Sequence, residues 1–254
     1  MPIPSVVLHI PHSSTIVPDD VRGRIVLSDE ALALELLAMT DHFTDELFAR
    51  PSDAARVVYP VSRLVVDPER FDDDSQEVMV SRGMGAIYTR TSAGAALRNE
   101  PDAAARAELL TRYYRPHHAA LMSAVRESLR DNGRSLVVDC HSFPSAPLPY
   151  ELDQRAERPD ICVGTDSFHT PNSLTDEVCG LFRAKGFTID VNRPFGGSIV
   201  PITFYRTDAR VSSIMIEVNR GLYMNEVTGE RSAQFGAVAD IVTSVLEQLG
   251  LGRS

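Results

Sequence analysis

The chain has 254 residues, of which 43% are hydrophobic and 24% charged, the composition of an ordinary globular protein that we expect to form one domain over 1–254. A formal net charge of −10 argues against a nucleic-acid partner, because attraction to phosphate backbones needs a basic face. No apolar run approaches the roughly 20 residues of a membrane span, and Met1–Pro4 carries no basic stretch of a secretory signal, so no membrane partner and a cytoplasmic location are expected.

The first third of the chain alternates apolar runs with polar loops. Ser5–Ile10 predicts a buried strand, and the following Pro11-His12-Ser13-Ser14 cannot continue a central strand. From Ser28 to about Ala49, apolar residues at helical spacing predict an amphipathic helix. A second short strand, Arg56–Tyr59, then leads into Arg63 and the apolar run Leu64–Val66.

The middle of the chain contains one segment of weak pattern and one long helix. The acidic sequence with glycine and serine at about 71–100 predicts a mobile loop or lid. The stretch 102–131 is helical in composition, with Pro116 expected to kink or break it and Asn132-Gly133 to end it. Leu136–Val138 follows as a buried strand that is expected to end at Asp139–Ser142.

The last third repeats the alternation of helix and strand after a proline-rich loop. The expected elements are a helix at Ser173–Lys185, a strand at Phe187–Val191, a turn at Gly196-Gly197, a strand at Ser213–Val218, and a final helix from Phe235 that ends at Gly250. This order predicts an α/β fold with a mixed, largely parallel sheet that helices cover on both faces.

Polar residues capable of catalysis gather where the predicted strands stop. His12 follows the first strand, Arg63 the second and His141 the strand Leu136–Val138, while Glu217 lies in the last strand. Because ligands bind beyond the carboxyl ends of the strands in open α/β sheets, these four residues are expected to converge.

Strand alternation separates the histidines that could take part. It places His9 within the body of its strand, where a core or supporting role is favoured, and leaves His12 in the loop as the better ligand. It also turns Asp139 and His141 to one face and Cys140 to the other, which disfavours a Cys140–His141 nucleophile pair. The three cysteines have no paired spacing and are expected to be reduced thiols.

Imidazole and carboxylate ligands together suit zinc, and a catalytic zinc commonly takes three protein ligands. Asp41 and Asp45 are spaced i, i+4 on the helix expected there, with Asp41 nearer the apolar stripe. His12, Asp41 and His141 supply the three ligands for one zinc or other divalent ion, with a solvated helix face as the equal alternative for Asp41. For His117 and His118, within the long helix, packing is the favoured role.

Glu217 lies in an otherwise apolar strand, where an unpaired carboxylate is costly. One interpretation is a structural ion pair with Arg220 or another arginine. The other is a general base that takes a proton from the attacking water and passes it to a leaving amine. Asp139 is the next candidate for the base.

Taken in order, these segments resemble the N-formylglutamate amidohydrolase family, whose fold is similar to that of the zinc carboxypeptidases. The segments that carry the resemblance are His9-Ile10-Pro11-His12-Ser13, Thr40-Asp41 through Asp45, Ser62–Asp67 with Arg70, Tyr114–His118, Asp139–Ser142, Gly164-Thr165-Asp166, Arg193 with Gly196-Gly197, and Glu217 through Met224.

The resemblance implies zinc on His12, Asp41 and His141, and a general base at Glu217. It also implies that Arg63, Arg70 and Arg193 hold substrate carboxylates by bidentate pairing. Asp67-Pro68-Glu69-Arg70 and Thr165–Phe168 depart from the family pattern, which leaves the chemistry intact and the acyl amino acid open.

The sequence therefore predicts a metal-dependent hydrolase of a small N-acyl amino acid, with N-formylglutamate, an intermediate of histidine degradation, as the leading substrate. The alternatives are a zinc carboxypeptidase or a deacylase for larger acyl groups, and a protein that binds a metal or ligand without turnover. A serine hydrolase is not indicated, because no G-x-S-x-G motif is present.

Overall fold

The computed structural model describes residues 6–48 and 54–251. Its strands are β1 (Val6–Ile10), β2 (Ala55–Val58), β3 (Ser135–Phe143), β4 (Ile161–Gly164), β5 (Ile189–Val191) and β6 (Val211–Asn219). Its helices are α1 (Asp19–Arg22), α2 (Asp29–Met39), α3 (Thr44–Leu47), α4 (Ala103–Leu109), α5 (Arg115–Asn132), α6 (Asn172–Ala184) and α7 (Phe235–Leu251). Short turns of other helix types are η1 (Val78–Arg82), η2 (Leu110–Tyr114) and η3 (Arg220–Leu222).

The six strands form one sheet in the order β2-β1-β3-β6-β4-β5. All neighbouring pairs are parallel except β4 with β6, which is antiparallel. The predicted α/β fold with a mixed, largely parallel sheet is therefore confirmed. Strand β4 was not predicted, because only four residues, Ile161–Gly164, form it within the proline-rich segment.

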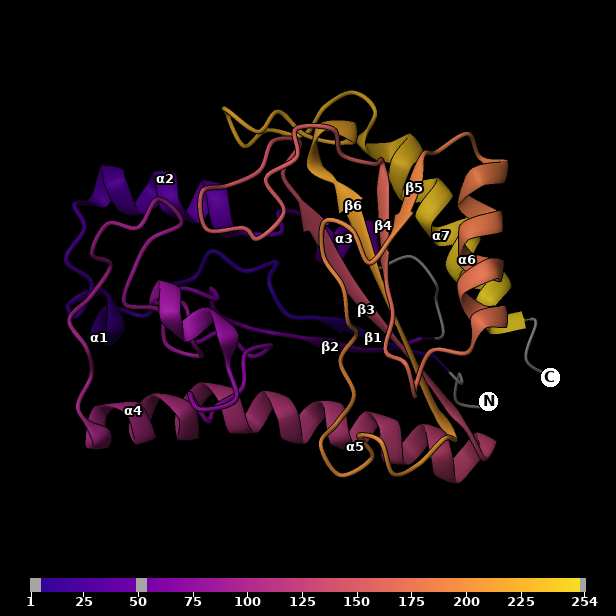
Figure 1. Cartoon of the computed structure of the whole chain (residues 1–254), viewed down its shortest axis with the longest axis horizontal. Helices are drawn as coiled ribbons and strands as arrows, with labels where there is room; N and C mark the ends of the chain where they lie inside the picture. The colour runs from indigo at the N-terminus through magenta and orange to yellow at the C-terminus, as the bar shows by residue number, and fades with distance from the viewer. Residues whose placement is uncertain (1–5, 49–53, 252–254) are drawn as a thin grey trace.

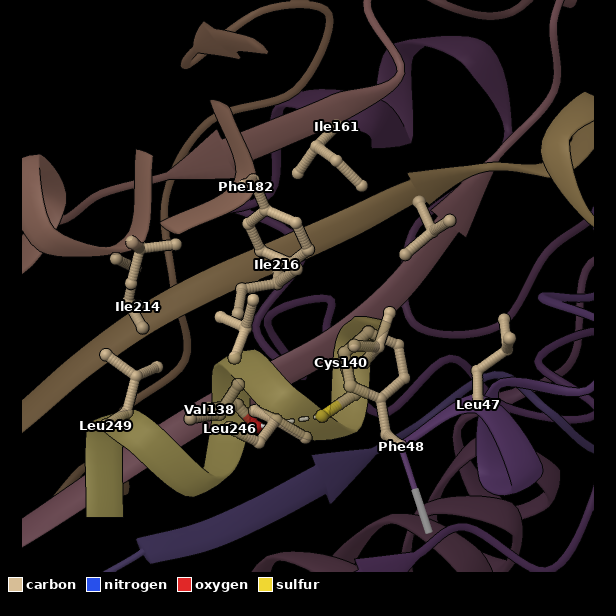
Figure 2. Close-up of a cluster of buried hydrophobic side chains, with 14 of the residues drawn as sticks. Leu47, Phe48, Val138, Cys140, Ile161, Phe182, Ile214, Ile216, Leu246 and Leu249 are labelled. Carbon is tan, nitrogen blue, oxygen red and sulfur yellow. Dashed lines mark hydrogen bonds between the residues drawn. The ribbon is translucent and has the colours of Figure 1, made fainter. Parts of the chain in front are cut away.

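Helices cover both faces of the sheet (Figure 1). On one face, alternate residues of β1, β3 and β6 pack with α6 and α7 in a large apolar cluster, part of which is drawn in Figure 2. On the other face, Val7, Val137 and Val211 pack against Leu121 and Val125 of α5. The sheet is thus apolar on both sides at its centre, which leaves its carboxyl end as the place where polar side chains gather.

The alternation of Asp139, Cys140 and His141 is as predicted. The Cys140 sulfur points into the apolar cluster of Figure 2 and lies 3.3 Å from the Val138 carbonyl oxygen, on the opposite face from Asp139 and His141. All three cysteines are buried free thiols, and burial raises the pKa of Cys140 well above its ordinary value. A Cys140–His141 nucleophile pair is excluded by this geometry.

The single helix predicted from Ser28 to about Ala49 is wrong. Helix α2 ends at Met39, because Thr40 is extended and the Asp41 N–H bonds to the His12 carbonyl oxygen at 3.0 Å instead of continuing the helical ladder. Phe43 then has a positive φ of 64° before α3 begins. Asp41 and Asp45 therefore do not share a helix face, whereas Ser5 and Ala49, the limits of two predicted elements, lie outside the described residues.

The predicted interruption of the helix at Pro116 takes the form of a change of helix type. The widened turn η2 ends at Tyr114 and joins α4 to α5, in which Pro116 is the second residue, where a missing N–H costs little. The helix ends as predicted at Gly133, whose φ is 71°. Strand β3 is longer than predicted, since Asp139–Ser142 continue the pairing with β6 and lie within the strand.

The segment at about 71–100 has little regular structure beyond η1, but much of it is packed. Met79, Met84, Tyr88 and Leu97 are buried together in one apolar cluster, and the segment lies to the left of the sheet in Figure 1. A role as a lid stays a prediction. Within residues 6–48 and 54–251, every helix falls short of the length or the apolar character that crossing a membrane requires.

Candidate active site

Three neighbouring strands bring their polar residues to one face of the sheet at its carboxyl end. The register sets His9 of β1 beside Asp139 of β3, and His141 of β3 beside Glu217 of β6. His12 lies just past the end of β1. Because alternate residues of a strand share a face, Asp139 and His141 both point to the side of the sheet that α5 covers.

Of these residues, all but His9 line a cavity of about 630 Å³ that reaches from the sheet to the loops around it. The predicted site residues in its wall are His12, Asp41, Arg63, Arg70, Asp139, His141 and Glu217. The Gly196-Gly197 turn and the residues of Pro68–Asp72 also line it. The cavity therefore unites segments that are far apart in the sequence.

Carboxylates fix both histidines of the predicted metal site. The Nε2 atom of His12 lies 2.9 Å from Asp67 Oδ1, and Nδ1 of His141 lies 2.9 Å from Asp41 Oδ2. A carboxylate only accepts hydrogen bonds, so each ring carries a hydrogen on that nitrogen. Of the other two nitrogens, His12 Nδ1 has no hydrogen-bond partner among the described residues, and His141 Nε2 lies 3.1 Å from Asp139 Oδ1. Both face the centre of the cluster, in the arrangement that supporting carboxylates give metal-bound histidines.

Glu69 supplies the third donor at this point. Its Oε2 lies 3.0 Å from His141 Nε2 and 4.0 Å from His12 Nδ1, and donor atoms of His12, Glu69 and His141 all lie within 4.8 Å of one another. The Glu69 N–H bonds to Asp67 Oδ1 at 3.0 Å, which ties the loop to the carboxylate that holds His12.

Sequence reasoning missed Glu69. It directly follows Asp67-Pro68 in a segment that departs from the family pattern, and nothing in its spacing to His12 or His141 points to it. The one available signal was the position of this charged segment after the second strand and Arg63, where a loop reaches the end of the sheet.

The cluster fits a cation. Nδ1 of His12 is buried and has no hydrogen-bond partner among the described residues, although imidazole nitrogens in such surroundings are normally satisfied. Burial acts to lower the pKa of His141, but the carboxylates of Glu69 and Asp139 raise it well above its ordinary value. Carboxylates that stabilise the positively charged form of a buried imidazole also stabilise a cation bound at the same place.

Asp41, one of the predicted metal ligands, lies behind His141. Its Oδ2 accepts from His141, and its Oδ1 is 2.9 Å from Arg220 Nη2. Burial opposes ionisation, yet the nearby His12 ring, the hydrogen bond from His141 and the charges of His141 and Arg220 keep the pKa of Asp41 well below its ordinary value. One oxygen of Asp41 is thus bonded to His141 and the other to Arg220. Glu69 is therefore better placed than Asp41 to offer an oxygen to a metal ion.

Glu217 is buried in the cavity wall and forms no ion pair with Arg220, which bonds to Asp41 and to the Ser142 hydroxyl instead. Burial raises the pKa of Glu217 to about 8. His141 opposes this rise, while the carboxylates of Asp41, Glu69 and Asp139 add to it. The position of Glu217 therefore does not support the structural ion pair with Arg220, and a buried carboxyl group with a raised pKa in a cavity wall is a candidate for proton transfer.

Two of the three predicted arginines lie at the cavity. Arg63 bonds to Asp67 Oδ2 through Nη2 at 2.7 Å and through Nε at 3.2 Å, so two of its three guanidinium nitrogens are already engaged. Arg70 is freer, with Nη1 3.7 Å from Glu77 Oε1 and a buried Nε that has no hydrogen-bond partner among the described residues.

Arg193 lies elsewhere. Its Nη1 pairs with Asp190 at 2.5 Å and its Nε with Asp153 at 3.2 Å, and it does not line the cavity. The role in substrate binding predicted for Arg193 therefore finds no support in its position. The sequence suggested Arg220 only as an ion-pair partner of Glu217. In the structure Arg220 is buried and pairs with Asp41 instead.

The remaining predicted residues surround the cluster. His9 is fully buried between Asp139, 2.8 Å from its Nδ1, and His117, 2.8 Å from its Nε2. His118 lines the cavity and bonds to the Pro68 carbonyl oxygen at 2.8 Å. Asp45 lies in α3 and does not line the cavity.

Comparisons with known proteins show which sequences this chain resembles. The sequence profile of the family described as N-formylglutamate amidohydrolase matches residues 4–224. The chain is 27% identical to an N-formylglutamate deformylase of Pseudomonas putida, over 86% of this chain and 81% of that protein.

Solved structures show the same fold. A crystal structure of N-formylglutamate amidohydrolase from Ralstonia eutropha JMP134 matches with a TM-score of 0.83 and 26% identity, over 98% of this chain and 94% of that one. A gene product of Agrobacterium tumefaciens matches with a TM-score of 0.70 and 21% identity, over 97% and 92% of the two chains, and this likeness concerns the fold alone.

Proposed function

This chain belongs to the N-formylglutamate amidohydrolase family, and from that premise we propose that it is a metal-dependent enzyme that hydrolyses N-formylglutamate to formate and glutamate. The observation that carries the proposal is the arrangement of His12 and His141. Each donates a hydrogen bond from one ring nitrogen to a carboxylate, Asp67 or Asp41, and its other ring nitrogen faces Glu69 near Glu217. A relative that is named as a deformylase supports the choice of substrate.

In this proposal His12, Glu69 and His141 hold a divalent ion, with zinc favoured by the mixture of imidazole and carboxylate donors. Asp67 and Asp41 orient the two histidines from behind. When bound, the ion supplies Lewis-acid chemistry, polarising the scissile carbonyl and lowering the pKa of water.

Glu217 moves the proton. Its buried carboxylate takes a proton from the water that attacks the formyl carbon and delivers it to the nitrogen as the C–N bond breaks, so that formate and a free amine leave. Arg70 and the remaining nitrogen of Arg63, Nη1, pair with the carboxylates of the substrate at the other side of the cavity.

A direct assay tests this function. Purified protein is stripped with a chelator and reloaded with zinc, and formate release from N-formylglutamate is measured together with the metal content. We expect turnover to disappear and return with the metal. Turnover that is independent of the metal would contradict the metal-dependent mechanism, and absence of turnover by the loaded protein would contradict the substrate.

The third ligand is tested separately. Glu69→Gln should weaken zinc binding about 10–100-fold or more, whereas Asp41→Asn, which retains a hydrogen-bond acceptor for His141, should weaken it less. A larger loss in Asp41→Asn would return Asp41 to the ligand set.

A second candidate, a deacylase for larger N-acyl groups, is favoured by the cavity itself. About 630 Å³ is in the range that encloses drug-sized ligands, and Phe71, Val78 and Ile202 line it with exposed apolar side chains. Comparing kcat/KM for N-formyl, N-acetyl and N-hexanoyl glutamate decides between the two, because a cavity used for longer acyl chains should give the last substrate the highest value.

A further inference from the structure

A second set of metal-donor atoms lies beside the first and shares one residue with it. His9, Glu69 and Asp139 each offer a donor atom, and these atoms lie within 4.8 Å of one another. His9 and Asp139 face each other on adjacent strands and are 0% and 2% exposed. This is a buried site of two strand residues and one loop residue rather than a surface group of acids.

Glu69 lies between the two sets with one oxygen toward each. Its Oε2 is the atom near His141 and His12, whereas its Oε1 lies 3.7 Å from His9 Nδ1. Asp139 has a similar position, because its Oδ1 is 2.8 Å from His9 Nδ1 and 3.1 Å from His141 Nε2. Donor atoms about 2.1 Å from one ion are about 3.0–3.4 Å apart in octahedral or tetrahedral geometry, so these separations suit coordination with small adjustments.

Two carboxylates of the cluster have no arginine or lysine partner among the described residues. Asp41 and Asp67 each have an arginine, Arg220 and Arg63 respectively. In the described part of the chain, by contrast, Glu69 and Asp139 pair only with histidines. A cation at the second donor set would lie between these two carboxylates and compensate their charge, which is costly to bury unpaired.

His9 can present the required nitrogen. Without a metal, its Nδ1–H donates to Asp139 Oδ1 at 2.8 Å, and its Nε2 lies 2.8 Å from Nε2 of His117. An ion bound at the second donor set would replace the Nδ1 hydrogen, and His9 would then carry its hydrogen on Nε2 and donate it to the His117 ring. Because His9 is supported by a neutral ring and not by a carboxylate, it is the weaker ligand.

We propose that the site holds two divalent ions, one on His12 and His141 and the other on His9 and Asp139, with the Glu69 carboxylate bridging them. This inference rests on the proposed function, which requires only the first ion. The second ion binds more weakly and compensates the charge of Asp139 and Glu69.

Metal stoichiometry tests the inference without any assay of turnover. The metal-free protein is dialysed against increasing zinc, and the bound metal is measured by elemental analysis. We expect two equivalents per chain, bound in two steps. His9→Gln, which keeps a side chain of similar size, should lose one equivalent and keep the other, whereas His12→Gln should lose the tighter one.

His118→Gln is the matched control, because His118 lines the same cavity but bonds to a backbone carbonyl and is in neither donor set. It should keep both equivalents. A second measurement needs no variant: Mn²⁺ loaded into the wild-type protein should give the electron paramagnetic resonance spectrum of an exchange-coupled pair.

The outcomes separate the two proposals. One equivalent at saturation that depends on His12, or two equivalents that His9→Gln does not change, would overturn the second site and leave the proposed function standing. An uncoupled Mn²⁺ spectrum at full loading would also overturn it. A protein that binds no metal at all would overturn the proposed function as well.

Discussion

At the scale of single residues, Glu217 combines burial, a position in the cavity wall and the absence of an arginine or lysine partner among the described residues. A carboxylate in such a place raises the free energy of the folded state and is retained for its chemistry. The alternative of a structural ion pair with Arg220 loses its basis, since Arg220 bonds to Asp41.

Glu217→Gln should therefore abolish most turnover without harming the fold. An amide of the same shape cannot accept the proton of the attacking water, so kcat should fall by about 10²–10⁴-fold while the metal content and the free energy of unfolding are maintained. Formate release, metal analysis and urea unfolding measure the three quantities.

Glu35→Gln is the matched control for this substitution. Glu35 is also buried and has a pKa raised by burial, but it bonds to Ser92 and does not line the cavity. Its turnover should be unchanged. If Glu217→Gln keeps turnover, the base lies elsewhere, and if it unfolds, Glu217 has a structural role.

The sequence was informative about residues whose backbone position follows from a strand. His12, Asp139, His141 and Glu217 could be placed because alternation along a strand fixes the direction of a side chain. Asp41 and Glu69 could not be distinguished as ligands, since both lie in irregular segments whose direction depends on contacts such as the bond from the Asp41 N–H to His12.

At the scale of elements, two glycine segments of the family resemblance meet at the edge of the sheet. Gly164 ends β4, and a Cβ built there would overlap the Gly197 carbonyl oxygen and the Met215 side chain. The motif Gly164-Thr165-Asp166 and the turn Gly196-Gly197 are therefore constrained by the same close approach, which sequence spacing could not reveal.

Gly164→Ala should displace the Gly196-Gly197 turn. Overlap with backbone cannot be relieved by a rotamer change, so we expect a loss of about 1–3 kcal/mol in the free energy of unfolding, with lower turnover because the turn lines the cavity. Gly180→Ala in α6 is the control: its Cβ meets open space, and alanine should stabilise the helix by up to about 1 kcal/mol. Equal stability of the two variants would show that the approach is not tight.

Helix α5 carries a histidine whose state should depend on pH. His117 is buried against His9 and the ring of Tyr59, and burial lowers its pKa to about 2, with the charges of His9 and His118 acting in the same direction. The unfolded chain takes up this proton near pH 6.5, so the stability that neutral His117 contributes is complete above about pH 6.5 and is lost as the pH falls toward 2.

His117→Gln should flatten this dependence. Between pH 6.5 and pH 5, the metal-free wild type should lose about 2 kcal/mol more than the variant in the free energy of unfolding, because each pH unit below the unfolded pKa costs about 1.4 kcal/mol. Urea unfolding with a chelator present measures this. The same loss in both proteins would mean that another group is responsible.

At the scale of the whole molecule, the formal charge of −10 must be reconciled with an anionic substrate. Fields of distant surface charges are screened over about 8 Å at physiological salt, whereas partly buried charges are screened much less. The arginines that line the cavity, Arg63, Arg70 and Arg220, are therefore the local cations that can pair with an anionic substrate, although the molecule as a whole repels anions.

Of these three arginines, Arg70 is the one whose guanidinium is free to pair with the side-chain carboxylate of the substrate. Arg220 is committed to Asp41 and two thirds of the Arg63 nitrogens to Asp67 and Tyr88, whereas Arg70 has only long contacts to Asp67 and Glu77. With a net charge of −10, an anionic substrate requires a local cationic pocket, but which arginine remains free for it depends on the ion pairs of the folded chain.

Arg70→Lys should lower kcat/KM for N-formylglutamate at least about tenfold more than for N-formylglutamine, because lysine keeps the charge but loses the planar fork that pairs with a carboxylate. Arg193→Lys is the matched control, since Arg193 pairs with Asp190 and Asp153 away from the cavity and should leave the ratio of the two values unchanged. Two results would contradict the role of Arg70 in binding the side-chain carboxylate. One is a wild-type protein that hydrolyses both substrates equally well, and the other is a ratio of the two kcat/KM values that only Arg193→Lys alters. A general loss of turnover in a variant lowers kcat/KM for both substrates by the same factor. Because the two substrates are similar in size, the ratio of their kcat/KM values still reports on the side-chain carboxylate.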